Sequence, residues 1–148
     1  MDLNQLDLTK GAAEGHKLTL KHPTTGDLFD QPGKELWIEV IGADSQDYRD
    51  ALMDIQRRRM ARIKKTRDLT TTPEQIDAEA LELLCVATRR WQLTLDGVAL
   101  PCDDPTKTAV YRRFAWIREQ VDAAIEDRAN FLRPSAERSS LPPSTSSV

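Results

Sequence analysis

Residues 45–67 carry the strongest helical pattern in the chain, and they predict one long helix near the middle of the sequence. Its apolar positions recur at the i, i+3, i+4, i+7 spacing of a single helix face, namely Tyr48, Ala51, Leu52 and Ile55. Ser45 follows a polar loop and is a favourable N-cap residue. Later in the helix the apolar stripe drifts to an edge formed by Met60 and Ile63, while the opposite face becomes strongly basic.

The basic part of this helix differs from the rest of the chain. The 148 residues have a net charge of −3, which excludes a histone-like or ribosomal-type basic protein. Residues 45–72 nevertheless contain eight Lys or Arg and four Asp or Glu, a local charge of +4. Residues 1–44 contain four against eight, and residues 73–132 contain seven against eleven, so each flank carries −4.

Further helices are predicted after the basic segment. Thr72, Pro73 and Gln75 are typical of an N-cap, a first helical residue and the third position of a capping box. This helix is expected to run to about Arg90, with a wide apolar face made of Ile76, Ala80, Leu81, Leu83, Leu84, Cys85 and Ala87. Two more helices are expected at residues 104–113 and 116–132, the last one stopped by Pro134.

Alternating polar and apolar residues predict strands at residues 17–22 and 36–41. The inward face of the second strand is either Leu36, Ile38 and Val40, or Trp37 and Ile41. Residues 91–95 also alternate and precede an Asp96-Gly97 turn, which is consistent with a short hairpin or an irregular excursion.

These elements predict an α+β, mostly α fold, in which about four helices cover a small antiparallel β-hairpin. We expect residues 1–15 to be a flexible N-terminus, residues 16–133 a single domain, and residues 134–148 a disordered tail rich in Ser and Pro. The longest apolar run, residues 83–87, has five residues, so no membrane-spanning helix is expected.

No catalytic or metal-binding motif is recognisable, so the chain is expected to be neither an enzyme nor a cofactor-binding protein. His16 and His22 lie close in sequence, but no Cys, Asp or Glu has a spacing typical of a metal site. Cys85 lies on an apolar helix face, and Cys102 has no His nearby in sequence. Asp103 and Asp104 precede a Pro, which favours a helix cap over a cation site.

The basic run at residues 57–67, in which seven of eleven side chains are cationic, is the main candidate for a binding site. Three interpretations remain: a solvated helix end, a docking surface for an acidic protein, or a nucleic-acid contact. The negative net charge and the lack of interleaved aromatic residues count against nucleic acid. The candidate partner-binding residues are Arg57, Arg58, Arg59, Arg62, Lys64, Lys65, Trp91 and Phe131.

Trp37, Trp91 and Trp116 are expected to anchor the core. Trp116 opens an amphipathic helix, which favours a buried position. Trp91 lies where a helix is expected to give way to a loop, so both a core and an interface position remain open for it.

Four segments together resemble the tail assembly chaperones of long-tailed siphophages. They are the turn at residues 23–27, residues 37–59, residues 91–101 with their Asp96-Gly97 turn, and residues 116–132. The resemblance covers roughly residues 17–132 and rests on the order of the segments, because no single motif is specific to the family.

The resemblance implies a binding protein that acts in the host cytoplasm without a cofactor. Members of this family bind the long, helical tape measure protein, keep it soluble and help tail tube subunits to polymerise around it. The resemblance therefore implies the tape measure and tail tube proteins as partners, with a homo-oligomer possible and no membrane. Two alternatives are a nucleic-acid-binding regulator that uses residues 57–67 and a structural minor tail or connector protein of the virion.

Overall fold

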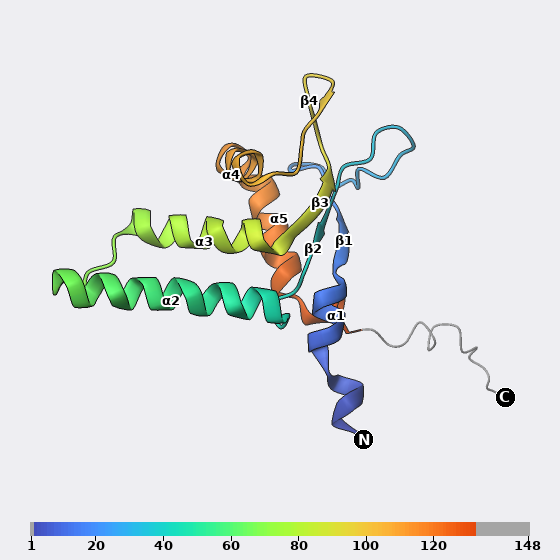
Figure 1. Cartoon of the computed structure of the whole chain (residues 1–148). Coiled ribbons are helices and arrows are strands. Elements are labelled where there is room, and N and C mark those ends of the chain that lie inside the picture. Colours follow the sequence, from blue (N-terminus) through green and yellow to red (C-terminus); the bar gives the residue numbers. More distant parts are fainter. Residues whose placement is uncertain (1, 133–148) are drawn as a thin grey trace.

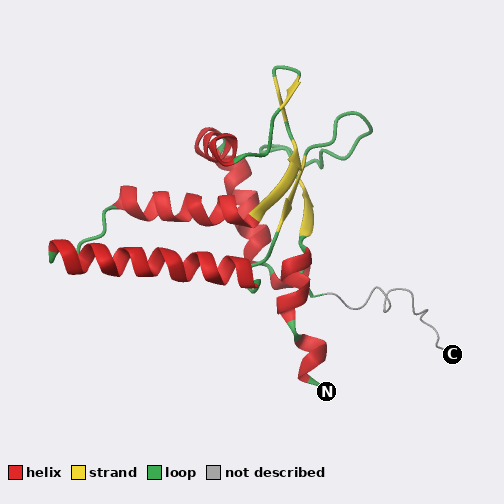
Figure 2. Cartoon of the chain, viewed as in Figure 1, coloured by secondary structure: helices red, strands yellow, loops and turns green. Residues whose placement is uncertain are grey.

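The computed structural model describes residues 2–132 and confirms the mostly helical α+β class (Figure 1, Figure 2). Within that range, most helices lie to one side of a small antiparallel sheet, two of them extend far beyond it, and the N-terminal helices lie at one end of the sheet. The expected disordered tail at residues 134–148 lies outside the described residues.

The sheet has three strands in the order β1 (His16–Thr19), β2 (Trp37–Val40) and β3 (Thr88–Gln92). Both pairings are antiparallel, and Ile38 lies between Leu18 and Trp91 in the register. A hairpin alone was expected, so β3 is an addition. It replaces the last turn of the helix that was predicted to reach Arg90.

The structure shows which face of β2 points toward the core. Ile38 and Val40 are fully buried, while Trp37 and Glu39 are on the opposite face and are only partly covered. The core next to these two residues is a continuous cluster from the sheet and the helices, including Leu20, Ile41, Leu81, Leu84, Ala87, Trp91, Tyr111, Ile117, Val121, Ile125 and Phe131.

A helical hairpin connects β2 to β3. Helix α2 (Gln46–Thr66) begins after the N-cap Ser45, as predicted, and α3 (Pro73–Ala87) begins with the predicted capping box. The two helices lie side by side and project away from the sheet, so the turn between them is the part of the hairpin farthest from it (Figure 1). The core residues of α3 are in its second half, and Ile76 near its start is exposed, contrary to expectation.

The remaining elements pack around the sheet. We call the sheet and the elements packed around it the body, as distinct from the projecting hairpin of α2 and α3. Strands β4 (Thr94–Leu95) and β5 (Val98–Ala99) form a small hairpin, and its predicted turn has positive φ at Asp96 and Gly97. Helix α4 (Asp104–Arg113) is capped by Asp103, as predicted. Helix α5 (Ala115–Glu126) packs on β2 and ends earlier than expected, before the 3-10 helix η2 (Arg128–Asn130).

Residues 1–15 were expected to be a flexible N-terminus without a regular pattern, but residues 3–6 and 8–14 form helical elements. These are a 3-10 helix η1 (Leu3–Leu6) and a helix α1 (Leu8–Glu14), each capped by an Asp side chain. Ala12 on α1 is buried, and its carbonyl accepts a hydrogen bond from the Gly42 N–H. This contact ties α1 to the body, whereas η1 extends away from it (Figure 1).

Candidate partner-binding site

All six cations proposed from the sequence lie in the half of α2 that projects from the body (Figure 1). The 21 residues of α2 give it a length of about 32 Å. Because a helix turns every 3.6 residues, these cations do not share one face. The structure divides them into a group that faces α3 and a group that faces solvent.

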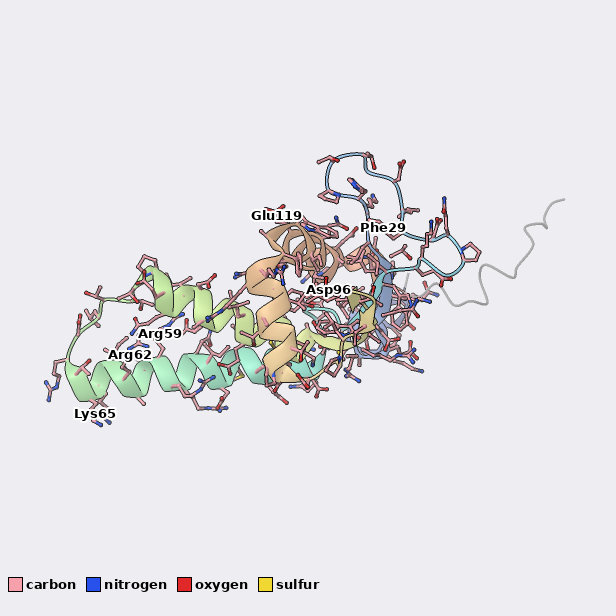
Figure 3. The ribbon with its side chains drawn as sticks, turned by 90° about the horizontal axis from the view of Figure 1, so that it is seen from above. Phe29, Arg59, Arg62, Lys65, Asp96 and Glu119 are labelled. Carbon is pink, nitrogen blue, oxygen red and sulfur yellow. The ribbon has the colours of Figure 1, made fainter. Side chains whose placement is uncertain are left out.

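The first group connects α2 to α3. Arg58 forms an ion pair with Glu82, and Arg59 forms one with Glu79. Figure 3 shows Arg59 and Arg62 extending from α2 toward α3. Arg58 and Arg59 therefore link the two helices of the hairpin, which gives them a structural role.

Some polar atoms that are buried between α2 and α3 lack hydrogen bonds that would compensate for the loss of water. The Nε atom of Arg59 and one terminal guanidinium nitrogen of Arg62 are buried without a hydrogen-bond partner in the described part of the chain. The carboxylates Glu79 and Glu82 raise the pKa values of Arg59 and Arg58 above their ordinary range through hydrogen bonding and charge. Both guanidinium groups accordingly stay charged.

The second group is open to solvent. The Arg57 side chain has its nearest carboxylate, Asp54, at 3.9 Å. Lys64 and Lys65 form no ion pair with any residue from 2 to 132, and Lys65 points away from α3 (Figure 3). Lys64 and Lys65 also occupy the last turn of α2, where cations are favoured by the helix dipole.

Two exposed methionines complete this solvent-facing surface. Met53 and Met60 are 53% and 63% exposed and lie seven residues, or about two turns, apart. With Arg57 and Lys64 they follow an i, i+4, i+7, i+11 spacing on the side of α2 opposite Ile55 and Arg59. We call Met53, Arg57, Met60 and Lys64 the outward face of α2. The sequence placed Met60 on the apolar edge with Ile63, but only Ile63 is partly covered.

Trp91 and Phe131, proposed as partner-binding residues, are core residues instead. Trp91 is 8% exposed, its indole N–H donates to the Leu100 carbonyl at 3.0 Å, and its ring meets Tyr111 edge-on. Phe131 is 2% exposed and packs so closely on Gly42 that a Cβ there would lie 2.8 Å from the ring. Neither ring is accessible to a partner.

Trp37, expected in the core, lies on the outer face of the sheet. The Lys17 ammonium is 4.5 Å from the centre of its ring and the Arg90 guanidinium 5.7 Å from it. Arg90 also donates to Glu39 at 2.9 Å, which fixes its position. These cations come from β1 and β3, so only the strand pairing, and no local sequence pattern, brings them to the tryptophan.

The remaining candidates for chemistry have structural surroundings. His22 Nδ1 accepts hydrogen bonds from the N–H groups of Thr24 and Thr25, each at 3.2 Å, and so shapes a turn. Burial raises the pKa of the Cys102 thiol, which disfavours the reactive thiolate. Among residues 2–132 no group of three or more His, Cys, Asp or Glu side chains is arranged to hold a metal ion.

Comparison with known protein families, curated proteins and solved structures finds no significant match to this chain. No helix in the described range is both long enough and apolar enough to cross a membrane.

Proposed function

We propose that the protein is a tail assembly chaperone of a long-tailed siphophage, which binds the tape measure protein in the host cytoplasm, keeps it soluble and promotes tail tube assembly. The observation that carries this proposal is the outward face of α2. It offers two exposed methionines and two cations on a helix that projects from the body. A surface of this kind suits a protein partner with apolar and acidic side chains.

The body supports the proposal through the segments that carry the family resemblance. Ile38 from residues 37–59, Trp91 from residues 91–101 and Val121 from residues 116–132 belong to one cluster of buried side chains. Segments that are distant in sequence therefore form a single structural unit. The hairpin of α2 and α3 projects from this unit (Figure 1).

The surface chemistry suits a chaperone that must later release its client. Methionine side chains are flexible and adapt to irregular apolar surfaces, such as the exposed faces of a long helical protein. Cations at the rim increase the rate of association with acidic segments more than they increase affinity. Because exposed ion pairs contribute little to stability, such a complex forms fast and is displaced by tail tube subunits that cover the same segments.

Co-expression with the tape measure protein of the same genome tests the proposal. We expect the tape measure protein to become soluble and to co-purify with the chain. Replacing Arg57 and Lys64 by Glu reverses two cations of the outward face, which repels acidic segments and should reduce co-purification. Replacing Lys34 and Arg112 by Glu makes the same charge change at exposed positions outside α2 and should leave it intact.

An insoluble tape measure protein that does not co-purify with the unmodified chain would refute the proposal. Mass spectrometry of mature particles gives an independent test. A chaperone is absent from purified virions, whereas a minor tail or connector component is present. Tight binding to duplex DNA that weakens steeply with salt would instead favour a nucleic-acid-binding regulator.

A further inference from the structure

A second exposed apolar surface lies on the N-terminal arm, which we define as residues 2–7. Leu3 and Leu6 of η1 are 80% and 48% exposed. A 3-10 helix has three residues per turn and rises about 2 Å per residue, so the two leucines lie on one side, about 6 Å apart. Asp2 and Asp7 flank them, and their carboxylates accept hydrogen bonds from the N–H groups of Asn4 and Thr9. The arm thus presents two leucines between two carboxylates.

The outward face of α2 has the complementary arrangement. Met53 and Met60 are about 10 Å apart along the helix, and the cations Arg57 and Lys64 alternate with them. The arm is acidic and apolar, and the face is basic and apolar. We infer that the N-terminal arm of one copy of the chain binds the outward face of α2 of a second copy, with the leucines on the methionines and the carboxylates near the cations.

The arm does not cover this face within its own chain. Arg49, in the first turn of α2, donates to the Thr9 hydroxyl at 3.2 Å and so holds α1 at the end of α2 nearest the body. From there η1 extends in a different direction from α2 (Figure 1). Met53 and Met60 lie four and eleven residues beyond Arg49, about 6 Å and 16 Å along the helix axis, and both are exposed, so the arm of the same chain does not cover them. A second copy therefore supplies the arm.

Helix α3, the most acidic helix in the described range, is a poorer occupant. Helix α3 carries four carboxylates, but Glu79 and Glu82 are paired with Arg59 and Arg58, and Asp77 is paired with Arg118 at 2.9 Å. Glu74 is the carboxylate of α3 that none of the described cations pairs. The arm keeps both of its carboxylates exposed beside exposed leucines.

The contact joins two different surfaces, so a pair of copies held by a single contact is not closed. Each copy in a pair still has one free arm or one free face, and assembly continues as protein concentration rises. Because the cations and carboxylates are exposed, salt screens their attraction, and about 0.5 M salt should shift the equilibrium toward monomers.

Sedimentation velocity of the untagged chain at low salt, over a series of concentrations, tests the inference. We expect the weight-average mass to rise above twice the monomer mass and to fall again at high salt. An arm variant, Leu3→Ser with Leu6→Ser, and a face variant, Arg57→Glu with Lys64→Glu, should each remain monomeric. All four side chains are exposed, so circular dichroism of both variants should match the unmodified chain.

An equimolar mixture of the two variants gives the sharpest test. The arm variant retains an intact face and the face variant retains an intact arm, so together they should form a heterodimer and stop there. A mixture that stays monomeric, or an unmodified chain that stays monomeric at the highest concentration, would overturn the inference. The measurement contains no tape measure protein, so its outcome is independent of the proposed function.

Discussion

Tyr111 and Thr88 illustrate how the core accommodates polar side chains. Thr88 donates its hydroxyl proton to the Leu84 carbonyl at 2.7 Å, so the Tyr111 hydroxyl, 2.6 Å from the Thr88 oxygen, acts as the donor to Thr88. Both side chains are almost fully buried. Burial raises the pKa of Tyr111 well above its ordinary value, because the phenolate would lose its hydration. The residue therefore stays protonated in the folded protein.

This raised pKa predicts that the protein becomes less stable at alkaline pH. Above about pH 10 a tyrosine ionises in the unfolded chain, while Tyr111 in the folded protein keeps its proton. The folded state then binds more protons than the unfolded state, so raising the pH lowers the free energy of unfolding. One such proton gives a slope approaching about 1.4 kcal/mol per pH unit above pH 10 and none below about pH 9.

Urea denaturation of the unmodified chain and of Tyr111→Phe across this range measures the slope. The variant should lose less stability per pH unit. Tyr48, whose pKa is also raised by burial, is present in both proteins, so the difference between the two slopes reports Tyr111. Equal slopes would mean that Tyr111 ionises normally in the folded state.

The two helices of the hairpin begin with caps in different surroundings. Ser45 is fully buried, and its hydroxyl oxygen accepts from the Tyr48 N–H at 3.2 Å. Thr72 is exposed at the far end of the hairpin, and its hydroxyl oxygen accepts from the Gln75 N–H at 3.1 Å. Loss of the buried cap leaves a donor shielded from water, whereas the N–H freed at the exposed cap bonds to solvent.

We therefore expect Ser45→Ala to lower the free energy of unfolding by about 1–2 kcal/mol and Thr72→Ala by about 0.5–1 kcal/mol. Urea denaturation of both variants gives these values. Hydrogen exchange at the Gln75 and Ile76 amides should accelerate in Thr72→Ala and stay unchanged in Ser45→Ala. Equal losses of stability would show that the exposed cap is as strongly coupled to the body as the buried one.

Helices with caps and clear periodicity could be predicted from the sequence, whereas β3 could not. Residues 88–90 continue the helical pattern of α3, Arg89 and Arg90 suited the end of a helix, and strand-like alternation was recognised only from residue 91. In the structure Arg89 and Arg90 pair with Asp47 and Glu39, on α2 and β2. Backbone pairing with β2 outweighs local helix propensity here, and that pairing joins segments about fifty residues apart.

The candidate site could be located from the sequence but not resolved into faces. Seven cations in eleven residues indicated a surface, but its division depends on α3. Glu79 and Glu82 select Arg59 and Arg58 for the inside of the hairpin, which leaves Arg57 and Lys64 outside. The exposed arm at Leu3 and Leu6 was missed because two leucines are too few for a periodic signal.

At the scale of the whole molecule, the body and the projecting part of the hairpin are expected to be separable. The buried cluster draws on the sheet, the second half of α3, α4 and α5, and it includes no residue between 56 and 80. We predict that replacing residues 61–76 by Gly-Ser-Gly-Ser leaves the body folded. Four residues reach about 13 Å, which exceeds the usual 8–10 Å between packed helix axes.

Thermal unfolding followed by near-ultraviolet circular dichroism checks this, because all three tryptophans lie in the body. The shortened chain should show one cooperative transition with a midpoint close to that of the unmodified protein. Loss of the tryptophan signal at low temperature would show that the projecting part of the hairpin is required for folding.

The pairing of Val40 with Thr88 shows how the helical hairpin is connected to the sheet. The chain leaves the sheet at one residue and returns beside it, so α2 and α3 form an insertion between two neighbouring strands. Whole helical turns added to or removed from both α2 and α3 would leave every strand partner unchanged. Such an architecture allows the length of the hairpin to change independently of the fold that carries it.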